Sequence, residues 1–414
     1  MIKVWALLVF VGSLASSEAQ VDYSQALQQY TSAIESSSGS AEAYWRRGNV
    51  YWEKGDYSLA LQDYNSSIAA DPGYSLAYLG RGNVYVRQGN YDQAVQEYNQ
   101  AIAIQPTLVD AYNNRGVAYR AEGDLDSAIQ SFNRAIELNP NFAEAYSNRA
   151  QAYSQQADFE SAIQDYTQAL ALNPNLAEAS WGRGNAYWES GDYDLAYQDY
   201  NRTIELAPNN PLGYLGRGNA DFCRGNYELA VDDYSRAIAL QPNFADAYNN
   251  RGVAYRAEGD LDRAIQDLTR AIELKPDSAE AYYNRGLAYR DKGDLERALQ
   301  DFTRAIALNP KLAEALNNRG ISLSDNKVDH DQAIKDLSRA AELGPASVRG
   351  SRAWAGKNHA KVAGSRVAIN SSHAGRDAKA PADSGRWRHN LLWMAPVAAA
   401  GILIFVFVRH RTKQ

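Results

Sequence analysis

Residues 41–74 read AEAYWRRGNVYWEKGDYSLALQDYNSSIAADPGY, and this stretch decides the fold. It contains two segments in which apolar residues recur every three or four positions, separated by Gly55 and Asp56. That spacing is typical of amphipathic helices, and a Gly-Asp pair is typical of a turn. Pro72 follows the second segment, and proline cannot continue a helix. The stretch therefore predicts two antiparallel helices joined as a hairpin.

The same pattern returns along most of the chain. Proline recurs every 34 residues, at positions 72, 106, 140, 174, 208, 242, 276 and 310. A fixed period of this size indicates an array of stacked hairpins, each burying its apolar face against its neighbours. We predict a capping helix in residues 20–40 and nine repeats over residues 41–345, which begin at positions 41, 75, 109, 143, 177, 211, 245, 279 and 313.

Small and large residues stand at fixed places in each repeat. In the first repeat they are Tyr44, Gly48, Tyr51, Ala60, Tyr64 and Pro72. This arrangement resembles the tetratricopeptide repeat. The resemblance implies an all-α, right-handed superhelical solenoid of antiparallel helix pairs. It also implies that the first helices line a concave groove, which takes an extended peptide or a helix of a partner protein.

The sequence also repeats with a longer period, in addition to the period of 34 residues. Residues 112–126 recur letter for letter as residues 248–262, which are 136 positions further along. Four repeats have therefore been duplicated. A groove feature in the first half of the array should have a copy in the second.

Every repeat carries an arginine where the family pattern prefers leucine. An acid stands sixteen residues later in most repeats, as in Arg47 with Asp63 and Arg251 with Asp267. A buried arginine needs an ionic partner, and an antiparallel hairpin brings two residues with this offset level. We predict one structural arginine–acid pair per repeat, with Ser131 as the exception.

The resemblance places tryptophans and asparagines in the groove. Asparagine can both donate to and accept from a peptide backbone, and tryptophan supplies contact area at low entropy cost. Binding requires Trp52 and Trp188 to be substantially exposed, whereas the alternative is that the tryptophans pack between repeats. The predicted groove residues are Trp45, Asn49, Trp52, Asn83, Asn114, Asn148, Trp181, Asn185, Trp188, Asn219, Asn250, Arg256 and Asn284.

Composition narrows the classes of function. Residues 20–345 hold 29 Lys/Arg and 46 Asp/Glu, a net charge of −17, which disfavours nucleic acid as a partner. The single cysteine, Cys223, excludes an internal disulfide framework. We find no nucleophile–base pair and no metal-ligand set in the sequence. We predict a scaffold that binds other proteins, with no catalytic activity, cofactor or metal. A receptor or assembly factor in secretion or envelope biogenesis, and a non-catalytic subunit of a membrane enzyme complex, are the alternatives.

Both ends predict a membrane location. Residues 1–19 have a lysine, an apolar run and small residues, as a secretory signal peptide does, with an uncleaved anchor as the alternative. Residues 391–408 carry no charge and are long enough for one transmembrane helix, with a removable sorting tail as the alternative. Residues 346–390 predict a flexible basic stalk, and residues 409–414 a short basic tail. We expect a single-pass topology with the repeats in the periplasm or outside the cell and the C-terminus in the cytoplasm.

Overall fold

The computed structural model describes residues 23–36, 40–325 and 329–343. Within those ranges the chain forms α-helices and no β-strand. The predicted signal peptide, stalk, transmembrane segment and basic tail all lie outside the described residues. None of the described helices combines the length and the apolar composition that a membrane crossing requires.

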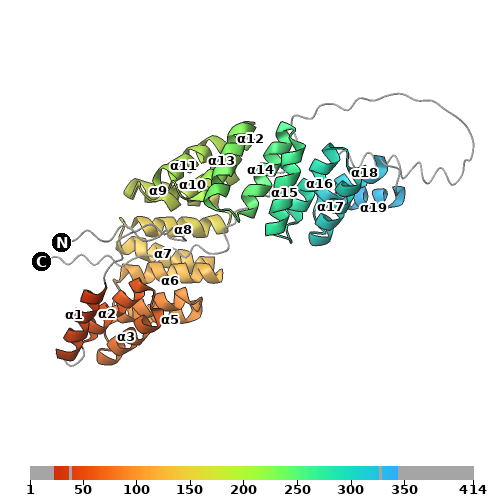
Figure 1. The fold of residues 1–414 in the computed structure, drawn as a ribbon. Helices are drawn as coiled ribbons and strands as arrows, with labels where there is room; N and C mark the ends of the chain where they lie inside the picture. Colours follow the sequence, from red (N-terminus) through yellow and green to blue (C-terminus); the bar gives the residue numbers. More distant parts are fainter. Residues whose placement is uncertain (1–22, 37–39, 326–328, 344–414) are drawn as a thin grey trace, which may run out of the picture. The chain divides into compact units, whose positions relative to one another are not determined.

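The chain divides into two units, and the described part of each is a stack of helices (Figure 1). In the first unit, α1 precedes three hairpins. Within a hairpin the two helices contact each other, and the second helix contacts the first helix of the next hairpin. The helices are α1 (Ser24–Ser36), α2 (Ala41–Lys54), α3 (Tyr57–Ala70), α4 (Ser75–Arg87), α5 (Tyr91–Ile104), α6 (Val109–Glu122) and α7 (Leu125–Leu138).

The second unit continues the same scheme through six hairpins. Its first four helices are α8 (Ala143–Gln155), α9 (Phe159–Leu172), α10 (Ala177–Ser190) and α11 (Tyr193–Leu206). The next four are α12 (Pro211–Cys223), α13 (Tyr227–Leu240), α14 (Ala245–Glu258) and α15 (Leu261–Leu274). The last four are α16 (Ala279–Asp291), α17 (Leu295–Leu308), α18 (Ala313–Asp325) and α19 (His330–Leu343).

The helices approach closely because glycines face a large side chain of the second helix. A Cβ added to Gly48 would lie 2.8 Å from Cε1 of Tyr64, and a Cβ on Gly80, in the next repeat, would lie 2.7 Å from Cζ of the same ring. Both distances are shorter than real Cβ contacts, so both positions need glycine. Tyr64 is 2 % exposed and fills the space between α2 and α4. Tyr200 fills the equivalent space in the second unit.

An arginine on the first helix of each repeat makes a polar contact with the second helix of its own repeat. In the seventh repeat, Nε of Arg251 lies 2.6 Å from Oδ2 of Asp267, and Nη2 lies 3.0 Å from Oδ1. In the first repeat, Arg47 makes the same two contacts with Asp63, both at 2.8 Å. Both of these planar guanidinium groups thus bind a nearly buried carboxylate through two parallel hydrogen bonds. In the third repeat, where Ser131 replaces the acid, Nε of Arg115 donates to Oγ of Ser131 at 3.1 Å.

The third nitrogen of the same arginines reaches the preceding repeat. Nη1 of Arg251 donates to Oγ of Ser235 at 2.9 Å, and Nη1 of Arg47 donates to Oγ1 of Thr31 in α1 at 3.1 Å. This contact links successive repeats, and the offset between an arginine and its acid did not predict it. Across the array the acceptors are Thr31, Asn65, Asn99, Thr167, Asn201, Ser235, Thr269 and Thr303.

The turn between the two helices of a hairpin requires a left-handed residue. Gly123 has φ 86° there, and its N–H donates to the carbonyl of Arg120. The fourth repeat has Ala157 in the turn, with φ 60°. A side chain disfavours this conformation, because its Cβ crowds the following carbonyl oxygen. The fourth hairpin is therefore closed at a cost in backbone strain.

Relieving that strain should stabilise the second unit. We expect Ala157→Gly to raise the free energy of unfolding by about 1 kcal/mol, because glycine adopts positive φ freely. Chemical denaturation measures this difference. The reverse exchange, Gly123→Ala, is the matched control and should lower the free energy of unfolding. An Ala157→Gly variant that unfolds at lower denaturant than the wild type would contradict the explanation.

Candidate functional site

The first helices of the hairpins form a continuous inner face within each unit. In the first unit α2 contacts α4 and α4 contacts α6, although a second helix intervenes in the chain each time. In the second unit the same contacts join α8, α10, α12, α14 and α16. Side chains on this face are therefore aligned from repeat to repeat, and they include most of the predicted groove residues.

Two asparagines on the inner face of the first unit are fixed by buried tyrosines. The Tyr64 hydroxyl donates to Oδ1 of Asn49 at 2.7 Å, and the Tyr98 hydroxyl donates to Oδ1 of Asn83 at 2.8 Å. Nδ2 of Asn114 also donates to Oδ1 of Asn83, at 2.9 Å. Burial raises the pKa of both tyrosines, so each phenol keeps its proton and acts as the donor. These contacts decide which amide atom is oxygen and which is nitrogen.

The second unit repeats the arrangement. The Tyr200 hydroxyl donates to Oδ1 of Asn185 at 2.8 Å, and the Tyr234 hydroxyl donates to Oδ1 of Asn219 at 2.9 Å. Nδ2 of Asn250 adds a second bond to Oδ1 of Asn219, at 2.9 Å. Burial again raises the pKa of both tyrosines. The amides of Asn185 and Asn219 are thus oriented in the same way as their counterparts.

The nitrogen atoms of these four amides remain available. In the described part of the chain, Nδ2 of each asparagine has no hydrogen-bond partner, and none of these atoms is buried away from solvent. An amide nitrogen carries two hydrogens, so each can donate to an acceptor outside the array. These asparagines are among the predicted groove residues, but the tyrosines that orient them were not predicted from the sequence. The oriented asparagines are Asn49, Asn83, Asn185 and Asn219.

The predicted tryptophans flank these amides but are partly buried. The Trp52 ring lies 5.1 Å from the Tyr57 ring, centroid to centroid, and the Trp188 ring lies 4.9 Å from the Tyr193 ring. Trp45 makes an edge contact with Tyr74 at 6.0 Å, and Trp181 packs beside the core around Tyr200. The expected substantial exposure is therefore not observed, and each indole offers only part of its surface to a ligand.

Four other predicted groove residues are engaged inside the stack. Asn114, Asn148 and Asn250 are 7 %, 2 % and 4 % exposed, so a ligand cannot reach them without rearrangement. Nε of Arg256 lies 2.6 Å from Oδ2 of Asp291 in the next repeat, and its side chain is 10 % exposed. Asn114, Asn250 and Arg256 each join their repeat to a neighbouring one through hydrogen bonds.

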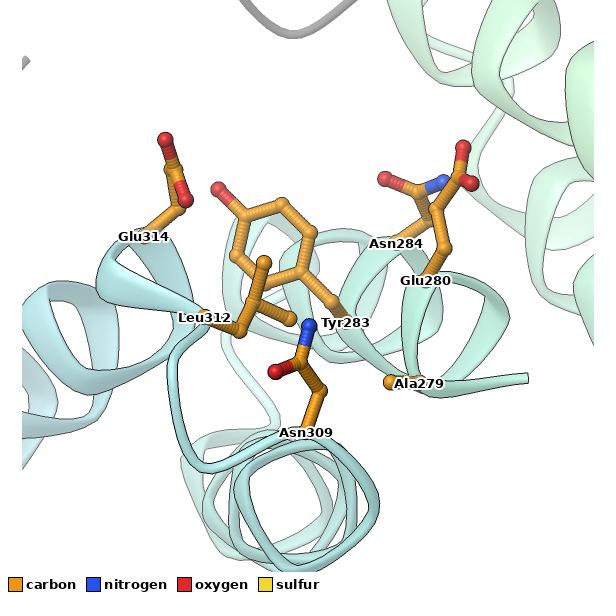
Figure 2. Close-up of a pocket in the computed structure, with 7 residues that line it drawn as sticks. All are labelled: Ala279, Glu280, Tyr283, Asn284, Asn309, Leu312 and Glu314. Atoms are coloured by element: carbon orange, nitrogen blue, oxygen red, sulfur yellow. The ribbon is translucent and has the colours of Figure 1, made fainter. Parts of the chain in front are cut away.

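Asn284 lines a small cavity of about 100 Å³ between α16 and α18 (Figure 2). Its Nδ2 donates to Oδ1 of Asn249 at 3.0 Å, and Nδ2 of Asn249 donates to Oε1 of Glu280 at 3.2 Å. Tyr283, Asn309 and Glu314 complete the polar lining. The contact between Asn249 and Glu280 was not predicted from the sequence, because it joins two different repeats.

Glu280 is a titratable group of this cavity whose pKa departs from its ordinary value. Burial raises its pKa from 4.5 to about 7, although the hydrogen bond from Asn249 acts in the opposite direction. The negative charge of Asp246 raises it further, and the positive charge of Lys275 lowers it. Glu280 therefore carries a proton in the folded protein over a range of pH in which an exposed glutamate does not.

Comparison with protein families identifies the array. Tetratricopeptide-repeat family patterns match residues 18–75, 82–120, 116–157, 147–211, 218–255, 252–290 and 279–312. The chain belongs to the tetratricopeptide-repeat family. Proteins of this family are in general non-catalytic scaffolds for protein–protein interaction. No curated protein matches the chain.

Solved structures share the fold. The APC/C hetero-tetramer Cut9–Hcn1 aligns with a TM-score of 0.53 and 16 % identity, covering 77 % of this chain and 76 % of that one. A tetratricopeptide repeat protein from Parabacteroides merdae is 23 % identical, with a TM-score of 0.48 over 60 % of this chain and 98 % of that one. YrrB, described as a tetratricopeptide protein with an unusual peptide-binding site, is 29 % identical, with a TM-score of 0.39 over 46 % of this chain and 98 % of that one.

The raised pKa of Glu280 predicts a pH dependence of stability. Between pH 4.5 and about 7 the folded state holds a proton that the unfolded state has released, so the free energy of unfolding falls as the pH rises through this window. Glu280→Gln, which keeps the shape and has no charge, should lack this contribution and be the more stable protein above the window. Denaturant unfolding of both proteins across the window measures the difference. Parallel pH profiles would contradict the assignment.

Proposed function

We propose that the inner face binds an extended segment of partner proteins, with backbone carbonyl groups accepting hydrogen bonds from the oriented asparagines. The supporting observation is that a buried tyrosine holds Oδ1 of Asn49, Asn83, Asn185 and Asn219, which leaves Nδ2 as the free end of each amide. A donor that is fixed before binding loses little freedom on binding. The neighbouring indoles supply apolar contact for side chains of the ligand.

The charges of the inner face favour a neutral or basic ligand. An acid stands at the second position of most first helices. Burial raises the pKa of Glu178, and the neighbouring charge of Glu144 raises it further. A basic group nearby would stabilise the ionised form of such acids, and an acidic group would oppose it. The acids are Glu42, Asp110, Glu144, Glu178, Asp246, Glu280 and Glu314.

A substitution that changes only the free end of the amide tests this function. Asn49→Asp together with Asn185→Asp keeps an oxygen for the Tyr64 and Tyr200 hydroxyls but replaces each donor nitrogen by an acceptor. We expect a short peptide, selected from a displayed random library on the full-length chain, to bind this variant about tenfold more weakly. Fluorescence anisotropy of the labelled peptide measures the dissociation constant.

The matched control introduces the same two charges on second helices. Asn65→Asp and Asn201→Asp stand in α3 and α11, where each side chain accepts a hydrogen bond from an arginine, as a carboxylate also does. This control should bind the peptide as the wild type does. Equal weakening of both variants would assign the effect to net charge, and unchanged binding by both would contradict the role of the inner-face amides.

We propose further that the array is tethered to a membrane with its repeats outside the cytoplasm. The support is the sequence alone: an export signal pattern in residues 1–19 and an uncharged stretch in residues 391–408. The ligand would then be an extracytoplasmic protein, since the inner face would meet only partners on that side of the membrane.

Protease accessibility tests this topology. Protease added to intact cells or spheroplasts should digest the repeats and leave a short protected C-terminal fragment, because the membrane shields only the last part of the chain. An antibody against residues 409–414 detects the fragment after lysis. Repeats that stay intact until the membrane is broken would reverse the orientation.

A further inference from the structure

The two units carry the same set of inner-face contacts. The Asn49 and Asn185 amides accept from a tyrosine at 2.7 and 2.8 Å, and the Asn83 and Asn219 amides do so at 2.8 and 2.9 Å. In both units the second of these amides also accepts from an asparagine of the following repeat at 2.9 Å.

The aromatic flanks are repeated as well. The centroid distance from the Trp52 ring to its tyrosine is 5.1 Å, with an interplanar angle of 61°. For Trp188 the values are 4.9 Å and 59°. Each set is complete within its own unit, because every residue that orients a donor belongs to the unit that presents it. Neither set depends on the other for its geometry.

We infer that each chain holds two copies of the same ligand segment, one on each unit. This inference rests on the proposed function of the inner face. Two sites built from the same side chains, with the same donors free, recognise the same chemistry: an extended, neutral or basic segment with carbonyl acceptors one repeat apart and an apolar side chain on the indole. One membrane-bound chain thus gathers two partner molecules.

The two sites differ at the rim. In the first unit, Nη2 of Arg87 donates to the Tyr57 hydroxyl at 2.9 Å, and its guanidinium lies 5.2 Å from the ring centre. In the second unit, Cys223 stands at the equivalent place beside Tyr193 and Asp194. A cavity of about 350 Å³ lies there. Arg224 lines this cavity too, and its Nη2 lies 3.1 Å from Oδ1 of Asp194. The arginine of the first rim is bound to a neutral phenol and the arginine of the second to a carboxylate. This difference in local charge makes the two affinities unequal, so binding occurs in two resolved steps.

The test compares three variants of the full-length chain with the selected peptide. One carries Asn49→Asp and Asn83→Asp, the second carries Asn185→Asp and Asn219→Asp, and the third carries all four changes. Isothermal titration calorimetry should give two peptides per wild-type chain, one for each double variant and none for the quadruple variant. Native mass spectrometry counts the bound peptides independently, and circular dichroism verifies that the helices remain.

Other outcomes overturn the inference in distinguishable ways. One peptide per wild-type chain, lost in either double variant, means that a single ligand spans both units. One peptide, lost in only one double variant, means that only that unit binds. Two peptides that remain bound to the quadruple variant contradict the proposed function together with the inference, because the amides then play no part. An Arg87→Ala variant that leaves both steps unchanged overturns the assigned cause of unequal affinity.

Discussion

The close contact between a glycine and a buried ring is the constraint on which the first, second, third, fifth, sixth and eighth repeats depend. Tyr64 can lie between α2 and α4 only because neither Gly48 nor Gly80 has a Cβ in its way. The ring in turn brings its hydroxyl to the inner face, within 2.7 Å of the Asn49 amide. A larger residue at either glycine would separate the helices and withdraw the hydroxyl from its acceptor. The shape of the core and the polarity of the inner face therefore have the same origin.

The arginines fix how the helices align along one another in this packing. A nearly buried ion pair such as Arg251 with Asp267 is costly to desolvate and contributes little net stability, but a misplaced repeat would leave one charge without its partner. The third contact, to Ser235 of the preceding repeat, extends that requirement from one hairpin to the next. The guanidinium thus specifies both the pairing of helices within a repeat and the order of stacking between repeats. The apolar contacts alone would tolerate small shifts.

The sequence was sufficient for features that recur with the period of the repeat. The helix pairs follow from the spacing of apolar residues, and the partner of Arg251 follows from an offset of sixteen positions inside one hairpin. Contacts between repeats were not found from the sequence, because their offset depends on how hairpins stack. The link from Asn249 to Glu280, 31 residues apart, is one example. The exposure of Trp52 was overestimated because its ring packs against Tyr57, the first residue of the following helix, and beside a core that includes Val84 of the next repeat.

In some repeats that lack the hydrogen bond between tyrosine and asparagine, both partners are replaced by apolar residues. The third repeat places Phe132 where the first has Tyr64, and Val117 stands where the first has Asn49. The eighth repeat makes the same double exchange, with Phe302 and Leu287. When the hydroxyl is absent, the amide that would accept from it is absent too, since an amide in that place would have no phenol to orient it. Apart from the fourth repeat, which has Tyr166 and Gln151 at these places, the described array thus consists of two kinds of repeat: polar ones that present a hydrogen-bond donor, and apolar ones that present none.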